Sequence, residues 1–136
     1  MPAGELGNHS ANRIFGEALN PYHFVRTVGG VCGSEAGLTG SKCCPFAIGT
    51  SYNGSISIPA AFNGIYAFRP TSGRFHMHGI GTAHLKKPKD LSKFFEKEFC
   101  SMGQSVDDCV IGFRVLTDKD AKREALWWND LDFLIS

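Results

Sequence analysis

The segment Tyr52-Asn53-Gly54-Ser55 has the residue types of a tight turn that brings a serine to the start of a helix. Asn-Gly tolerates positive φ angles, and Pro59 is compatible with the first turn of a helix from Ser55 to Phe62. Free backbone N–H groups at a helix start favour an anion, including the oxyanion of an acyl intermediate. Ser55 is therefore a candidate nucleophile, provided that a base takes its proton. The alternative, that Ser55 only caps the helix, is favoured by the spacing alone.

A glycine-rich loop, Thr27-Val28-Gly29-Gly30-Val31-Cys32-Gly33-Ser34, precedes this turn in the chain. It lacks both the Lys-Ser/Thr ending and the spacing of a phosphate-binding loop. Ser34 is expected to cap a helix from Glu35 to Gly40. The apolar run Pro45–Thr50 predicts a buried strand that leads into the turn, and Gly64–Arg69 predicts another strand.

Together these segments resemble the amidase signature. Gly29-Gly30-Val31-Cys32-Gly33-Ser34-Glu35 is similar to the family pattern G-G-S-S-G-G-E. Gly49-Thr50-Ser51-Tyr52-Asn53-Gly54-Ser55-Ile56-Ser57-Ile58-Pro59 is similar to G-T-D-I-G-G-S-I-R-I-P. The match runs in one register from about residue 13 to 75 and resumes near residue 100, where Met102–Asp108 resembles M-A-R-S-V-D-D. The fatty-acid-amide-hydrolase-like branch is the narrower assignment that this resemblance suggests.

The resemblance implies a catalytic triad of a serine nucleophile, a bridging serine in a cis peptide and a base lysine. Ser55 takes the position of the nucleophile. The oxyanion hole would consist of backbone N–H groups of Tyr52, Asn53, Gly54 and Ser55. In the family the lysine takes the proton of the bridging serine, which in turn takes that of the nucleophile.

Several chemically active positions depart from the family pattern. The bridging serine falls on Val31, which has no hydroxyl, and the serine beside it is Cys32. The aspartate of the second motif is Ser51, and the arginine after the nucleophile is Ser57. The arginine of M-A-R-S is Gln104. The base lysine would lie before residue 1, and no lysine of this chain matches its position. A drifting or inactive enzyme would show this pattern, in which glycines, prolines and apolar residues still fit the fold.

The fold implied by the resemblance is α/β, a partial amidase-signature fold with a mixed β-sheet flanked by helices. Residues 1–12 are expected to be a tail or linker, and residues 13–136 the central portion of the domain, truncated at both ends. Apolar periodicity predicts helices at 90–99 and 105–116. The apolar segment 121–136 and unpaired strand edges lead us to expect self-association.

Composition narrows the classes of function. The 136 residues suffice for one small domain, and 43% of them are apolar. With 14 basic and 13 acidic residues, nothing favours binding to nucleic acid. No apolar run reaches the roughly 20 residues of a spanning helix. His76, His78 and His84 do not form a convincing metal site, and neither a metal nor another cofactor is expected. The five cysteines are expected to be reduced thiols in a cytoplasmic protein, with peripheral membrane attachment of the full-length family member as an alternative.

Two functional interpretations follow. In the first, the chain belongs to a hydrolase of carbon–nitrogen amide bonds that acts on a small-molecule amide by serine acyl transfer. This chain is then expected to be inactive, because Val31 breaks the relay and the lysine is missing; a stand-in relay from Cys32 or Ser34 lies on the wrong residue of a tight loop. In the second, the chain is a catalytically dead fragment, which is an interaction protein or the product of a truncated gene model.

Overall fold

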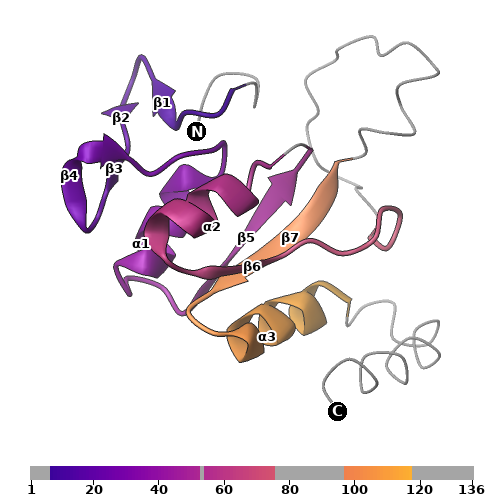
Figure 1. Cartoon of the computed structure of the whole chain (residues 1–136). Helices are drawn as coiled ribbons and strands as arrows, with labels where there is room; N and C mark the ends of the chain where they lie inside the picture. The colour runs from indigo at the N-terminus through magenta and orange to yellow at the C-terminus, as the bar shows by residue number, and fades with distance from the viewer. Residues whose placement is uncertain (1–6, 53, 76–96, 118–136) are drawn as a thin grey trace, which may run out of the picture.

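The computed structural model describes residues 7–52, 54–75 and 97–117 (Figure 1). Two small antiparallel hairpins come first, β1 (Ala11–Asn12) with β2 (Gly16–Glu17) and β3 (Leu19–Asn20) with β4 (His23–Thr27). They are followed by helix α1 (Gly33–Gly40), strand β5 (Phe46–Ser51), helix α2 (Ser57–Asn63) and strand β6 (Tyr66–Phe68). Strand β7 (Glu98–Gly103) and helix α3 (Val106–Thr117) complete the described elements.

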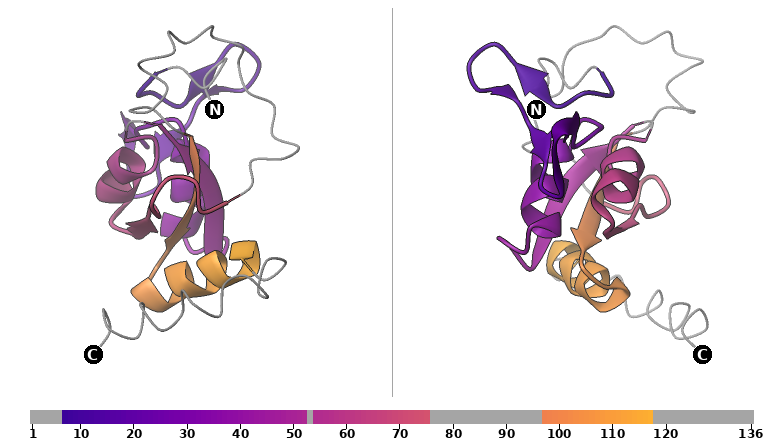
Figure 2. Two further views of the ribbon diagram at one scale, coloured as in Figure 1. Left: turned by 90° about the vertical axis from the view of Figure 1, so that its right-hand side faces the viewer. Right: turned by 60° about the vertical axis from the view of Figure 1, so that its left-hand side comes forward.

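A three-stranded sheet of order β5-β7-β6 is the centre of the molecule, and both of its strand pairs are antiparallel. Helices α1 and α2 cover one face, and α3 covers the other (Figures 1 and 2). The close neighbours of two glycines confirm this layering. A Cβ on Gly49 of β5 would lie 2.8 Å from Cys32 Sγ, whereas one on Gly112 of α3 would lie 3.0 Å from Ser101 Cβ. The expected α/β architecture, a sheet flanked by helices, is confirmed.

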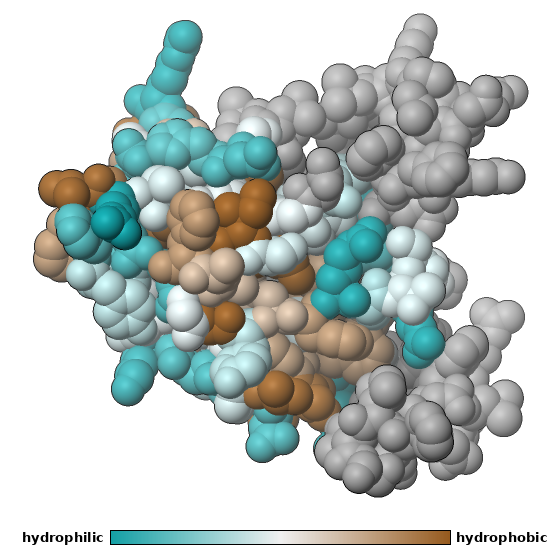
Figure 3. Space-filling model, viewed as in Figure 1, coloured by the Kyte–Doolittle hydropathy of each residue, from teal (hydrophilic) through white to brown (hydrophobic). Residues whose placement is uncertain are grey.

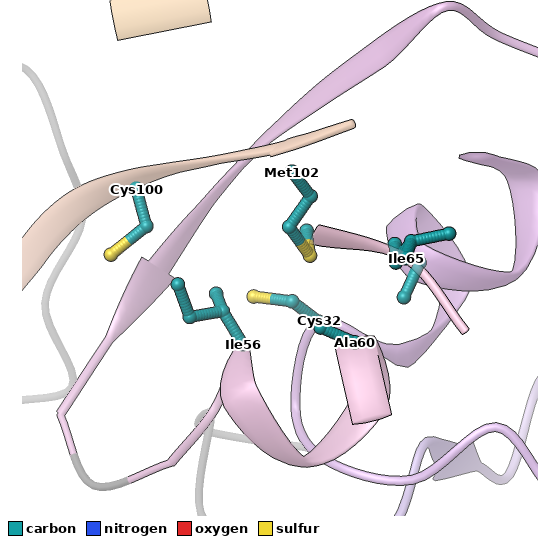
Figure 4. Close-up of a cluster of buried hydrophobic side chains, with 7 residues drawn as sticks. Cys32, Ile56, Ala60, Ile65, Cys100 and Met102 are labelled. Carbon is teal, nitrogen blue, oxygen red and sulfur yellow. The ribbon is translucent and has the colours of Figure 1, made fainter. Parts of the chain in front are cut away.

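The core lies between the sheet and the layer of α1 and α2. Figure 4 shows side chains from α2, β7 and the segment around α1 converging there. This cluster consists of Cys32, Ala36, Ile56, Ala60, Ile65, Cys100 and Met102. It joins the two glycine-containing motifs to β7, which is far from them in the sequence.

Two predicted elements match the structure closely. The strand expected at Pro45–Thr50 is β5, and the helix expected at 105–116 is α3. The start of α3 is fixed by a reciprocal contact. Asp108 Oδ2 accepts the Ser105 N–H at 2.9 Å, and Ser105 Oγ accepts the Asp108 N–H at 3.2 Å.

Other predictions are corrected. Helix α1 begins at Gly33 after Cys32, so Ser34 lies within the helix and is not its cap. The helix predicted at 90–99 is wrong at its end, because Glu98 and Phe99 belong to β7, and residues 90–96 lie outside the described residues. A short apolar run is compatible with both structures, and here pairing with two strands decides for the sheet. The segment before Arg13 is not simply a tail, since it supplies β1 and the buried Ser10.

Among the described residues, no helix is both long enough and apolar enough to cross a membrane. The five cysteines are free thiols, as expected, but Cys43 is exposed. His76, His78 and His84 and the apolar segment 121–136 lie outside the described residues.

Candidate active site

The two motif loops meet directly through their backbones. The Cys32 N–H donates to the Ser55 carbonyl over 3.2 Å. Gly30 has a φ of +62°, and a Cβ there would lie 2.4 Å from Pro59 Cδ and 2.9 Å from Ser55 O. Only glycine fits this conformation and this close approach without strain. The contact places Val31 and Cys32 of the first motif beside Ser55 of the second.

Ser10 anchors the first motif, the glycine-rich loop around Val31, through hydrogen bonds to its backbone. Its side chain is only 1% exposed. Ser10 Oγ donates to the Gly30 carbonyl at 2.7 Å and accepts the Gly33 N–H at 3.0 Å. Ser10 thereby satisfies buried backbone groups on both sides of Val31 that have no partner in a helix or sheet. Sequence reasoning missed this residue, because an isolated serine before a glycine loop has no distinctive pattern.

Asn63 fixes α2 to the same loop. Its side chain is fully buried, and Nδ2 donates to Val28 O at 3.0 Å and to Pro59 O at 2.7 Å. Asn63 and Ser10 therefore hold the two motifs at a defined separation.

Ser55 does not cap α2. The helix begins at Ser57 after Ile56, which makes no side-chain capping bond, so the predicted start at Ser55 is corrected. Ser55 is 7% exposed, and its hydroxyl forms no hydrogen bond with any residue in the described part of the chain. Gly54 precedes it with a φ of +80°. The capping role is therefore not seen, and the Ser55 backbone carbonyl instead accepts the Cys32 N–H.

The expected relay position offers no proton acceptor. Val31 is 4% exposed and lies in the loop against Ser55. Cys32 is fully buried, and its thiol donates to the Thr50 carbonyl at 3.3 Å. Within the described residues all peptide bonds are trans. Val31 therefore has no group that can bridge Ser55 to a base, and the Cys32 thiol is engaged with the strand.

A buried carboxylate that sequence reasoning missed lies at the same end of the sheet. Glu98 of β7 pairs with Ser51 of β5, so both side chains lie on the face that α1 and α2 cover. Glu98 is 2% exposed; its Oε1 accepts the Gly73 N–H, whereas its Oε2 has no hydrogen-bond partner among the described residues. Ser51, at the position of the family aspartate, is 1% exposed. A carboxylate is therefore present near this position, but on the neighbouring strand.

Cys100 lies next to Glu98 on the same strand face. Burial raises the pKa of its thiol to about 12, an effect that the nearby Arg69 guanidinium partly opposes. Burial also raises the pKa of Cys109. These protonated thiols are packing groups and poor nucleophiles.

The other residues that the sequence suggested for the site are not all gathered around Ser55. Tyr52 and Gly54 flank Asn53, which lies outside the described residues, so the complete set of proposed oxyanion donors is not seen together. Gln104, at an arginine position of the family, donates Nε2 to the Thr39 carbonyl and links β7 to α1. Among the described residues, no cluster of three or more histidine, cysteine or acidic side chains that could hold a metal ion was found.

Comparison with known proteins places this arrangement in a family. The Amidase family model matches residues 1–126. The chain therefore belongs to the amidase family, and its fold is part of the amidase fold. A crystal structure of an amidase superposes with a TM-score of 0.69 at 28% identity, covering 84% of this chain and 24% of that one.

Curated relatives come from several branches of the family. An amidase of Gibberella zeae is 40% identical over 80 residues, which are 59% of this chain and 15% of that protein. A glutamyl-tRNA(Gln) amidotransferase subunit of Treponema denticola is 31% identical over 130 residues, 96% of this chain and 25% of that protein. Fatty acid amide hydrolase 1 of Caenorhabditis elegans is 36% identical over 88 residues, 65% of this chain and 15% of that protein. The chain thus spans a quarter or less of each of these relatives.

Proposed function

We propose that this chain carries the nucleophile-bearing part of an amidase that cleaves amide C–N bonds by acyl transfer, with Ser55 as the nucleophile. The observation that carries the proposal is the position of Ser55. It follows the Gly54 turn in contact with the first motif, it does not cap α2, and its hydroxyl has no other partner in the described residues. Backbone N–H groups from Tyr52 to Ser55 are the proposed oxyanion donors.

We further propose that the chain is inactive by itself. A serine hydroxyl is a weak nucleophile at neutral pH unless a base takes its proton. Val31 cannot relay that proton, because its side chain has no hydroxyl. Members of a catalytic triad act as a unit, so that loss of the bridging hydroxyl alone is expected to remove most of the activity.

The experiment measures hydrolysis of a small amide by the chain, by Val31→Ser and by Val31→Ser/Ser55→Ala. A fatty-acid anilide tests the fatty-acid-amide-hydrolase-like branch, which the Caenorhabditis elegans relative supports, and glutamine tests the amidotransferase branch. We expect no turnover of either substrate by the unmodified chain, and such turnover would contradict the proposed inactivity. Turnover by Val31→Ser that disappears in Val31→Ser/Ser55→Ala would support Ser55 as the nucleophile and Val31 as the cause of the inactivity.

An interaction protein is the second candidate, and exposed apolar residues in the N-terminal hairpins favour it. Phe15 is 86% exposed and Val25 is 83% exposed. Such surfaces in folded proteins are typical of association sites. Light-scattering chromatography distinguishes the outcomes, since a sharp monomer peak at high concentration would contradict self-association.

A further inference from the structure

A cavity of about 750 Å³ lies between the β3–β4 hairpin and the C-terminal half of α2. The hairpin contributes residues between Asn20 and Thr27 to its wall, and the helix contributes Ala61 and Phe62. This volume is in the range of cavities that bind small organic molecules. Ser55 and the residues that fix the motif loops are not part of its wall, so the cavity is separate from the candidate active site.

Hydrogen bonds hold the walls in place. Asn20 Nδ2 donates to the Phe62 carbonyl over 2.8 Å and ties the hairpin to the end of α2. The Tyr22 hydroxyl donates to the Gly40 carbonyl over 2.6 Å and ties it to the end of α1. A Cβ on Gly29 would lie 2.8 Å from the Phe62 ring, so the backbone packs closely against that ring. The cavity is therefore a largely preformed space between anchored elements.

Arg26 is the one permanently charged side chain among the described residues that line the cavity. Arg26 and His23 line the cavity, and neither forms a hydrogen bond or ion pair in the part of the chain that the structure describes. No carboxylate from the described residues lines it. The Glu17 carboxylate of the β1–β2 hairpin is not part of the wall and lies 3.4 Å from His9 Nε2. A guanidinium without a partner beside a preformed cavity is suited to a carboxylate, which it can bind through two parallel hydrogen bonds.

The apolar part of the wall is aromatic. The Phe62 ring is half exposed on the helix side, and the Tyr22 ring is exposed on the hairpin side. Aromatic side chains favour flat apolar groups that stack or meet them edge to face. The wall of the cavity thus combines the Arg26 guanidinium with the aromatic rings of Tyr22 and Phe62.

We propose that this cavity binds a small organic anion with a planar apolar body, of the aromatic carboxylate class. The carboxylate lies against the Arg26 guanidinium, with His23 as a second donor, and the ring system lies between Tyr22 and Phe62. The site does not depend on the proposed acyl transfer at Ser55.

The probe is 2-naphthoate, and isothermal titration calorimetry measures its binding to the whole chain, to Arg26→Gln and to Phe62→Ala. Arg13→Gln is the matched control, because Arg13 is an exposed arginine that does not line the cavity. The neutral 2-naphthalenemethanol tests the need for the anion. Circular dichroism verifies that each variant stays folded, which we expect because Arg26 and Phe62 are both exposed.

We expect saturable binding of 2-naphthoate to the chain and to Arg13→Gln. Arg26→Gln should weaken it by about tenfold or more, as loss of a charge-assisted hydrogen bond implies. Phe62→Ala should weaken it severalfold. Equal binding of the neutral alcohol, unchanged affinity in Arg26→Gln, or no binding at millimolar probe would overturn the proposal.

Discussion

The layer of motifs and the N-terminal arm of this molecule differ in what their apolar residues contact. In the motif layer, formed by the loop at 27–32 with α1 and α2, Val28 is 1% exposed and Ile56 is 2% exposed. In the arm, formed by the hairpins β1–β2 and β3–β4, Phe15 and Phe24 are largely exposed. Figure 3 shows apolar side chains on the surface near β3 and β4.

The two regions also differ in hydrogen bonding. The motif layer is held by buried bonds from Ser10 and Asn63, whereas the side-chain bonds within the β1–β2 hairpin, such as Asn12 Oδ1 accepting the Phe15 N–H, are exposed. Buried and fully paired groups define a single arrangement, whereas exposed ones compete with water. We infer that this chain by itself specifies the scaffold around Ser55 more strongly than it specifies the β1–β2 hairpin, whereas Asn20 and Tyr22 tie the β3–β4 hairpin to α2 and α1.

The largest difference in stability between the two regions is expected when alanine replaces either of two glycines that have similar backbone conformations. Gly30 in the motif layer has a φ of +62° and no room for a Cβ, whereas Gly16 in the arm has a φ of +76° and no atom within 4 Å of that position. Gly30→Ala should lower the free energy of unfolding by about 3 kcal/mol, from backbone strain and overpacking together. Gly16→Ala should cost only the strain, about 1 kcal/mol. Urea denaturation measures both, and equal losses would remove the distinction.

Ser10→Ala should destabilise the protein by about 2 kcal/mol, because it leaves buried groups of Gly30 and Gly33 unpaired. Ser41→Ala is its control. Ser41 Oγ donates to the Leu38 carbonyl at 3.1 Å in an exposed position, so that its loss should cost less than about 0.5 kcal/mol. If the two variants melt at the same temperature, Ser10 does not anchor the first motif.

Alkaline pH should weaken the core through Cys100. Its pKa is raised from 9.0 to about 12 by burial, so above pH 9 the unfolded chain loses this proton while the folded chain keeps it. Stability should fall by up to about 1.4 kcal/mol per pH unit between these two values and be unaffected by this group below pH 9. Cys100→Ala should flatten that decline, and Cys43→Ala, which removes an exposed thiol, should not. Urea titrations from pH 8 to 11 make the comparison.

The smallest effect on stability is expected in the arm. Phe15→Ser combined with Val25→Ser should change the free energy of unfolding by less than about 0.5 kcal/mol, because both side chains already face solvent. The same variant should reduce self-association in light-scattering chromatography. Leu38→Ser, which changes an exposed residue of α1, is the control. A large loss of stability in the arm variant would show that the arm is packed in solution.

The helices and strands nearest to the two motifs are predictable from sequence, because their conformation depends on residues that are close together in the chain. The apolar run that forms β5, the turn glycine at Gly54 and the acidic first turn of α3 each determine a structure over a few residues. The place of Ser55 after the turn favours a helix cap by itself, and the family resemblance is what suggests Ser55 as the nucleophile. The alternative role of Ser55, as the cap of α2, could be tested only by the structure, in which the helix begins at Ser57.

The contacts between distant segments are not predictable in this way. Ser10, Asn63 and Glu98 act through partners 20 to 35 residues away, and nothing in their immediate sequence marks those partners. Strand β7 is missed for the same reason, since its pairing with β5 and β6 is nonlocal and the apolar residues before it suit a helix equally well. The family resemblance suggested the candidate nucleophile, whereas the buried carboxylate of Glu98 came only from the structure.

The most direct test of the proposed inactivity is the reactivity of Ser55 towards a fluorophosphonate probe. Some oxyanion stabilisation can survive the loss of triad members, but an unassisted hydroxyl at neutral pH is almost wholly protonated. Under conditions that saturate an active amidase, mass spectrometry should find no probe adduct on the Ser55 peptide. An adduct that appears on the chain and is lost in Ser55→Ala would contradict the proposed inactivity, because it would require a base and a relay that Val31 cannot supply.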